Sequence, residues 1–148
     1  MAALSDVKQL IVEALKDDST LVGLLGSDAS GQTPVYRDPA MGKLLWLPSV
    51  TVQEVYVRCE QAGLGDAYDG GKRYGWNHAL IQIDVWARNP EQRDELSARV
   101  QQVLLAADFR AEGLAISPPS IFALAEPERA VYRHSIRFTA FYVADVSV

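Results

Sequence analysis

The feature that most constrains the fold is an alternating segment, residues 78–88, that runs directly into a helical pattern. Apolar residues occupy every second position of this segment, namely Ile81, Ile83, Val85 and Ala87. A period of two predicts a strand with one apolar face. Asn89 then provides an N-cap, Pro90 suits the first helical position, and Gln92 stands where a capping box requires Glu or Gln. The helix that follows has an apolar stripe, which we expect to lie back across the strand, at Leu96, Val100, Val103, Leu104 and Ala107.

Similar patterns predict the rest of the chain. The other expected elements are two helices and three strands, at residues 4–15, 21–25, 50–57, 121–124 and 131–143. Gly26 closes the second helix, and Val35-Tyr36 forms a brief extended piece within a loop. No internal repeat or linker divides residues 1–148, so we expect one domain. The order of elements predicts the α+β class, with a mainly antiparallel sheet of about four strands and the helices packed on one face.

Composition excludes several classes of protein. The formal net charge is −5, which argues against a general nucleic-acid binder, because such proteins need a basic face to neutralise phosphates. Cys59 is the only cysteine, so the chain has neither an internal disulfide nor a cysteine-rich zinc site. No apolar run approaches about 18 residues, and the N-terminus lacks a signal-peptide pattern. We therefore expect neither a membrane span nor secretion by a signal peptide.

The residue types that carry catalysis are sparse. His78 and His134 are the only histidines, and each falls on a predicted strand without an evident nucleophile or metal-ligating partner. The stretch 70–73, Gly-Gly-Lys-Arg, lacks the spacing of a phosphate-binding loop and does not open a helix. We therefore predict no catalytic residue, no metal site and no cofactor, and we do not expect an enzyme.

One strand face remains unexplained by packing within a single chain. An antiparallel sheet can wet one face, so its polar residues are individually unremarkable. Trp86 and Phe141 are harder to leave in water, and large aromatic side chains are common anchors of interfaces. We predict that this face is an oligomer interface, formed by Gln82, Asp84, Trp86, Arg88, Arg133, Arg137 and Phe141.

A second unexplained stretch is the glycine-rich segment 58–76, which we interpret as a long loop. Its glycines raise the entropy cost of ordering it, whereas its aromatic and basic residues have the composition of an interface. We therefore predict a mobile arm that becomes ordered when a partner docks. The predicted docking residues are Tyr68, Lys72, Arg73, Tyr74 and Trp76. The alternative is a loop that folds back over its own core.

With these residues placed, the chain resembles the tail-terminator and tail-completion proteins of long-tailed bacteriophages. The likeness rests mainly on the strand that runs into a capped helix, HALIQIDVWARNPEQRDELSARVQQVL. The remaining shared features are an N-terminal amphipathic helix, a short helix ending LVGLLG, the strand PSVTVQEV, a glycine-rich excursion and the closing strand AVYRHSIRFTAFYV.

This resemblance implies a structural role in the virion. Such proteins form a ring, usually of six copies, that caps the head-proximal end of the tail tube, stops its polymerisation and joins the tail to the head connector. The implied partners are further copies of the chain, the tail tube protein and the head–tail connector protein. DNA would pass through the ring without sequence-specific binding, no membrane is involved, and assembly would take place in the host cytoplasm. The alternatives are a head-closure (neck) or tail-tube subunit of the virion, and a small ligand-binding α+β domain or enzyme.

Overall fold

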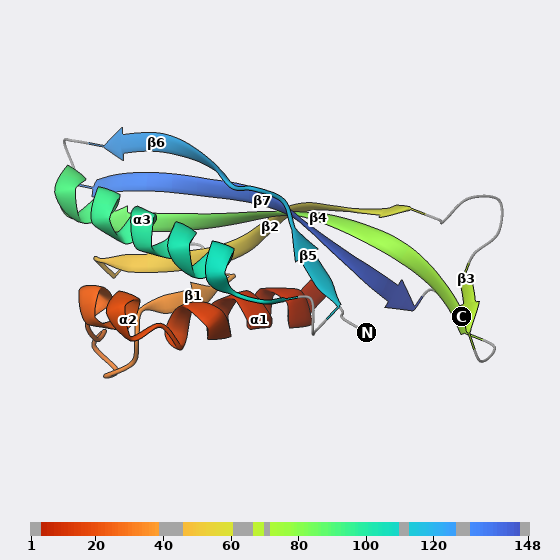
Figure 1. The fold of residues 1–148 in the computed structure, drawn as a ribbon. Coiled ribbons are helices and arrows are strands. Elements are labelled where there is room, and N and C mark those ends of the chain that lie inside the picture. The colour runs from red at the N-terminus through yellow and green to blue at the C-terminus, as the bar shows by residue number, and fades with distance from the viewer. Residues whose placement is uncertain are drawn as a thin grey trace.

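The computed structural model describes residues 4–38, 46–60, 67–69, 72–109, 113–126 and 131–145 (Figure 1). Within these residues the helices are α1 (Leu4–Lys16), α2 (Ser19–Leu25) and α3 (Pro90–Ala106). The strands are β1 (Val35–Arg37), β2 (Ser49–Glu60), β3 (Ala67–Asp69), β4 (Lys72–Ala87), β5 (Leu114–Ile116), β6 (Ser120–Glu126) and β7 (Val131–Asp145). No helix among the described residues is long and apolar enough to cross a membrane.

The strands form one seven-stranded sheet in the order β1-β2-β4-β7-β5, with β3 paired to β4 and β6 paired to β7. Every pairing is antiparallel except that of β1 with β2. The predicted α+β class with a mainly antiparallel sheet is therefore confirmed, but the expected number of about four strands is wrong. β1 corresponds to the brief extended piece predicted at Val35-Tyr36. The additional strands β3 and β5 have three residues each, which is too short to show a recognisable alternation.

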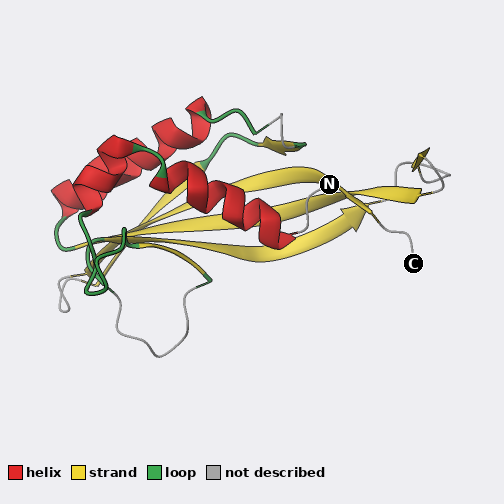
Figure 2. Ribbon diagram, turned by 90° about the horizontal axis from the view of Figure 1, so that it is seen from below, coloured by secondary structure: helices red, strands yellow, loops and turns green. Residues whose placement is uncertain are grey.

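All three helices lie on the same side of the sheet, as the two views in Figures 1 and 2 show. Alternate residues of β4 point into this layer, and Ile81, Ile83 and Val85 are completely buried there. Val100 of α3 and Ile11 of α1 belong to the same core. The predicted apolar strand face, the helical stripe and the packing of helices on one face are thus confirmed.

The junction between β4 and α3 is capped as the sequence predicts. The Asn89 side chain accepts a hydrogen bond of 2.8 Å from the backbone N–H of Gln92, and Pro90 begins the helix. The Gln92 side chain reaches back and accepts a hydrogen bond of 3.0 Å from the backbone N–H of Arg88. The reciprocal bond therefore closes one residue before the cap, which ties the end of β4 to the first turn of the helix.

Two polar clusters fasten the helices in place. Asp18 caps α2 by accepting a 2.9 Å hydrogen bond from the N–H of Leu21. The same carboxylate receives two bonds from Arg99 of α3, Nη2 to Oδ1 at 2.6 Å and Nε to Oδ2 at 2.8 Å. The hydrogen bonds from Arg99 are the largest cause that lowers the pKa of Asp18 to about 2. One side chain thus caps one helix and pairs with another.

Lys8 of α1 is nearly buried and links α1 to the β1–β2 side of the sheet. Its ammonium group binds Asp38, just after β1, and Glu54 of β2, the latter at 2.7 Å. Burial alone would lower the pKa of Lys8, but the hydrogen bonds that its ammonium group donates to the two carboxylates outweigh burial and raise the pKa. A buried ammonium is tolerated here because it is paired with carboxylates and hydrogen-bonded.

The predicted loop over residues 58–76 is wrong for the residues that the structure describes. β2 continues to Glu60, which pairs with Trp76 of β4, and the short β3 pairs with the start of β4. Figure 1 shows these strands running beyond the helices. The glycines disrupt the alternation on which a strand prediction depends, whereas main-chain pairing with β2 and β7 needs no side chain. Residues 61–66 and 70–71 lie outside the described residues.

Candidate interaction surface

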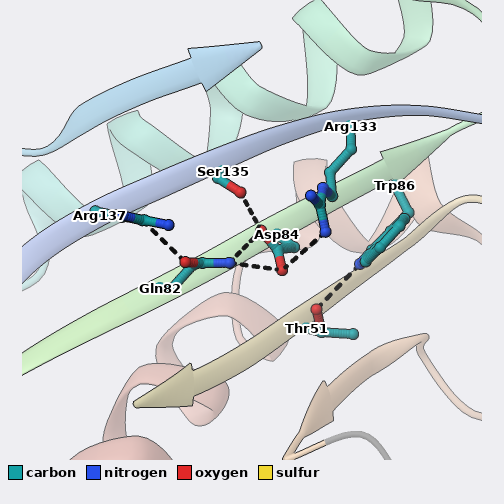
Figure 3. Close-up of polar contacts among 7 residues, drawn as sticks. All are labelled: Thr51, Gln82, Asp84, Trp86, Arg133, Ser135 and Arg137. Carbon is teal, nitrogen blue, oxygen red and sulfur yellow. Dashed lines mark hydrogen bonds and ion pairs between the residues drawn. The ribbon is translucent and has the colours of Figure 1, made fainter. Parts of the chain in front are cut away.

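The candidate functional surface is the side of the sheet that faces away from the helices, here called the helix-free face. Its centre is set by the register of β4 and β7, where Gln82 lies opposite Arg137, Asp84 opposite Ser135, and Trp86 opposite Arg133. Directly opposed residues of an antiparallel pair share one face. The register therefore brings together five of the residues predicted as an interface: Gln82, Asp84, Trp86, Arg133 and Arg137 (Figure 3).

Asp84 is the hub of the polar contacts on this face, and only 2% of its surface is exposed. Its carboxylate accepts hydrogen bonds from the amide of Gln82 at 3.0 Å and from the hydroxyl of Ser135 at 2.5 Å. Arg133 lies at the limit of an ion pair, with Nη1 4.0 Å from Oδ2 of Asp84. A buried carboxylate is costly unless donors surround it, and these three side chains supply them.

Two arginines form the outer layer of the helix-free face. The guanidinium of Arg133 lies over the ring of Trp86, 4.8 Å from its centroid. The guanidinium of Arg137 lies over the ring of Phe122 on β6 at 5.5 Å, and its Nε donates to Gln82 at 2.9 Å. Trp86 is itself held by a 3.1 Å hydrogen bond from its indole N–H to Thr51 of β2. Arg133 is thus held by stacking on Trp86 and by the ion pair with Asp84, and Arg137 by stacking on Phe122 and the hydrogen bond to Gln82.

This arrangement corrects one expectation about the polar face. Gln82 is 8% exposed and Asp84 is 2% exposed, so the centre of the face is not wetted by solvent. Burial is achieved by the neighbouring side chains of the same face, since the helices lie on the other side. Gln82 and Asp84 therefore lie beneath the surface and orient Arg133 and Arg137, which are the groups that a partner could reach.

The remaining two residues of the predicted interface lie away from this centre. Phe141 of β7 is opposite His78 of β4, and the two rings meet edge to face with centroids 4.7 Å apart. Arg88 follows the end of β4, is exposed, and donates a 2.9 Å hydrogen bond to the carbonyl of Leu47. The structure therefore places Phe141 on the helix-free face and Arg88 just beyond the end of β4.

The predicted docking residues of segment 58–76 lie on the strands that run past the helices. Tyr68 belongs to β3 and is opposite Arg73 of β4, while Lys72, Tyr74 and Trp76 follow along β4. The side chains of these five residues lie outside the described part of the structure. The backbone places these five residues on two paired strands, and their docking role stays a prediction.

The sequence interpretation missed the exposed apolar residues of β2 and β6. Val55, Tyr56 and Val57 are exposed on β2, as are Ile121, Phe122 and Leu124 on β6. The available signal was residues 121–125, which are five apolar residues in a row without a charge. Such a run normally indicates a buried strand. The exposure of these side chains becomes apparent only from the position of β6 at the edge of the sheet.

The described residues offer little for catalysis. They contain no group of three or more His, Cys, Asp or Glu residues that could hold a metal ion. His134 lies beside Asp94, with Nε2 3.7 Å from Oδ1. Burial lowers the pKa of His134, the charge of Arg93 lowers it further, and Asp94 opposes both. His134 is therefore favoured in its neutral form on the covered side of β7, away from the helix-free face.

Comparison with known proteins decides the family. A family model described as "Tail completion protein gp17" matches residues 9–143. The chain belongs to this tail completion family. It is accordingly a structural tail protein of a virion, which is the broad assignment that the resemblance in sequence implied. No curated protein matches the sequence.

A solved structure supports the fold of this tail completion protein. The similar chain comes from a structure titled "Virion of native gene transfer agent (GTA) particle", with a TM-score of 0.51 and 18% sequence identity. The alignment covers 90% of this chain and 92% of that chain, so it includes nearly the whole of both. At this identity the likeness shows a shared fold.

Proposed function

We propose that this tail completion protein assembles into a ring, of six copies, that caps the head-proximal end of the tail tube. The ring would stop polymerisation of the tube and join the tail to the head connector. The observation that carries the proposal is the helix-free face, where Arg133 and Arg137 are held over aromatic rings. No helix of the described residues covers this face. An ordered surface of this composition suits a contact between proteins.

The side chains of the helix-free face are held in fixed positions, which favours binding. A side chain that is already fixed loses less conformational entropy when a partner arrives. Arg133 and Arg137 are fixed from below by Asp84 and Gln82, through contacts that bury both of those acceptors. Repeating one contact between the helix-free face and a different surface of the next copy gives a head-to-tail arrangement, which closes into a ring when the rotation permits.

The electrostatics fit a channel for DNA better than a DNA-binding site. The formal net charge is −5, and the described residues of the first two helices and the segment after them carry more acidic than basic side chains. Phosphate contacts dominate non-specific binding to DNA, so an acidic lining would let DNA pass without gripping it. The role we propose is thus structural, with the tail tube protein and the connector protein as partners and the virion tail as its location.

The strands that run past the helices are the proposed docking element for the tail tube or connector. Their residues Tyr68, Lys72, Arg73, Tyr74 and Trp76 combine aromatic and basic side chains, which are enriched at interfaces. A paired strand extension can reach a partner beyond the body of the subunit, and main-chain pairing positions it without helices. This placement supports the docking role that we propose for segment 58–76.

The proposal is tested by measuring the mass of the purified protein, alone and mixed with tail tubes from the same particle, by light scattering and negative-stain imaging. Wild type should form rings, either alone or at one end of the tubes, and these tubes should stop growing. Trp86→Ala and Arg137→Ala should weaken assembly, while circular dichroism shows a folded chain. Arg137 is exposed, so we expect Arg137→Ala to fold. This variant tests the proposal even if Trp86→Ala fails to fold.

Several results would contradict this function. A chain that remains monomeric in both conditions is not a ring-forming cap. Rings that attach to isolated heads and not to tubes would instead indicate a head-closure protein. Co-polymerisation along the whole tube would indicate a tube subunit.

A further inference from the structure

The exposed apolar side chains of the described residues are concentrated on two strands. Eight large apolar side chains are exposed, and six of them lie on β2 and β6. The β2 group is Val55, Tyr56 and Val57, and the β6 group is Ile121, Phe122 and Leu124. Tyr56 is 57% exposed and Phe122 is 49% exposed, which are large fractions for aromatic residues. Phe122 is partly covered by the guanidinium of Arg137, yet all six side chains remain exposed in a single copy.

β6 forms an unguarded edge of the sheet. It pairs with β7 from Ser120 to Glu126, and no strand of the described residues pairs with its other side. Edge strands are normally protected by a charged residue, a proline or a bulge, because their free N–H and C=O groups invite pairing with another chain. β6 contains no proline, its only charge is Glu126 at the last position, and its register with β7 is continuous. This strand is therefore a ready template for one more strand.

The second half of β2 provides a free edge at the opposite margin of the same sheet. β1 pairs only with residues Val50–Val52 of β2. Beyond them, β2 continues to Glu60 and pairs with β4 on one side, while no described strand lies on the other side. A register shift between Glu54 and Tyr56 marks a bulge here, which adds twist to this edge. The stretch after the bulge, residues 56–60, is regular.

These two edges complement each other in composition. Phe122 and Leu124 are opposite Ser135 and Arg133 of β7, so they stand on the helix-free face, as does Tyr56, which is opposite Leu80. Ile121 and Val57 stand on the other face, opposite Ile136 and Ala79. Pairing the two strands would bring Tyr56 close to Phe122 and Leu124 on the helix-free face, and Val57 close to Ile121 on the other. Cross-strand contacts of these kinds stabilise a sheet.

We propose that β6 of one copy pairs with the second half of β2 in the next copy, so that one sheet continues from subunit to subunit. The occupant is a second copy because the chain itself carries both edges. β2, β4, β7 and β6 alternate in direction, so neighbouring copies turned about an axis along the strands would meet in an antiparallel pair. The inference rests on the proposed ring and adds main-chain pairing at the two margins of the sheet to the contact proposed for the helix-free face.

The geometry of the edges favours a closed ring. The contact joins two different surfaces, so it is head-to-tail and leaves one free edge at each end until the ring closes. The edges are also offset along the sheet. β6 lies beside the part of β7 that pairs with Gln82–Ala87, whereas residues 53–60 of β2 pair with Trp76–Gln82. An offset of this kind requires strands that tilt relative to the ring axis, as they do in barrels.

The experiment uses the full chain and places one charge on each edge. Phe122→Lys and Tyr56→Lys should each weaken self-association by at least about tenfold in sedimentation or light scattering. Leu105→Lys is the matched control, because Leu105 is 68% exposed, apolar and on α3, away from both edges. It should assemble as wild type does. Both edge residues are exposed, so circular dichroism should show folded variants.

Mixing the two edge variants tests the head-to-tail pairing directly. Phe122→Lys retains an intact β2 edge and Tyr56→Lys retains an intact β6 edge, so the mixture should form a 1:1 complex and nothing larger. A pairing of β6 with β6 would instead leave Phe122→Lys monomeric in every mixture and let Tyr56→Lys dimerise with itself. That result would overturn the inference.

The failure of this inference is distinguishable from failure of the ring. If both edge variants assemble as well as wild type does, the edge pairing is wrong, and the proposed function is unaffected. If Trp86→Ala abolishes assembly and the edge variants do not, the contact lies on the helix-free face instead. Wild type that assembles neither alone nor with tail tubes would overturn both proposals.

Discussion

The centre of β4 is buried on both faces, but by different means. On the covered face, Ile81, Ile83 and Val85 are 0% exposed because the helices lie over them. On the helix-free face, Gln82 and Asp84 are 8% and 2% exposed, although no helix covers them. Their cover consists of side chains from the same sheet, chiefly Arg133 and Arg137.

The difference between the faces assigns them different tasks. Apolar burial on the covered face is non-directional and supplies most of the stability. Polar burial on the helix-free face is costly unless each group is satisfied, so it adds little net stability and fixes the geometry. The first face therefore holds the fold together, and the second presents arginine and aromatic groups in set positions. The predictions below test that division, beginning with the largest effect.

The largest loss is expected on the covered face. Ile83→Ala removes a fully buried side chain from the central strand, and it should lower the free energy of unfolding by about 2–5 kcal/mol. Leu80→Ala is the matched variant on the helix-free face, where Leu80 is half-buried, and it should cost less. Urea unfolding monitored by circular dichroism measures both. Equal losses would contradict the claim that the covered face supplies most of the stability.

A smaller loss is expected at the hub of the helix-free face. Asp84→Ala removes the acceptor of Gln82 and Ser135 and should cost about 1–3 kcal/mol, because buried donors lose their partner. Ser135→Ala removes one of those donors and should cost about 0.5–1.5 kcal/mol in the same urea titration. If Asp84→Ala changed neither the free energy of unfolding nor assembly, the polar contacts would neither stabilise this face nor organise it.

The covered face could be predicted from the sequence, whereas the helix-free face could be predicted only in part. The alternation of Ile81, Ile83 and Val85 and the cap at Asn89 are local signals, and the structure confirms both. The burial of Asp84 is different, because it depends on Ser135 and Arg133 about fifty residues away. Only the register of β4 with β7 brings these residues together, and a single sequence does not encode that register in any short pattern.

The strand extension and the edge of β6 escaped prediction for related reasons. Glycines at 63, 65, 70, 71 and 75 indicate a loop, yet Gly75 pairs with Ala144 and continues the ladder. The apolar run at 121–125 indicates a buried strand, yet β6 lies at the margin of the sheet. In both cases the deciding factor is where a strand lies among its neighbours. The five docking residues and the oligomer interface were chosen by composition, and their roles stay predictions.

The smallest effect concerns the helix layer that creates the covered face. The pKa of Asp18 falls from an ordinary 3.8 to about 2 in the folded chain, chiefly through the hydrogen bonds from Arg99. A lowered carboxyl pKa stabilises the fold above the unfolded value, so this contribution is complete above about pH 4 and disappears as the pH falls towards 2. Asp18→Asn isolates this contribution, because asparagine is also a good N-cap but carries no charge for Arg99. Wild type should therefore melt at a higher temperature than Asp18→Asn at pH 6, and the gap should narrow as the pH falls towards 2 and close below it. Equal melting temperatures at pH 6 would show that Asp18 acts through its cap alone, and α2 would then be attached to α3 by packing rather than by charge.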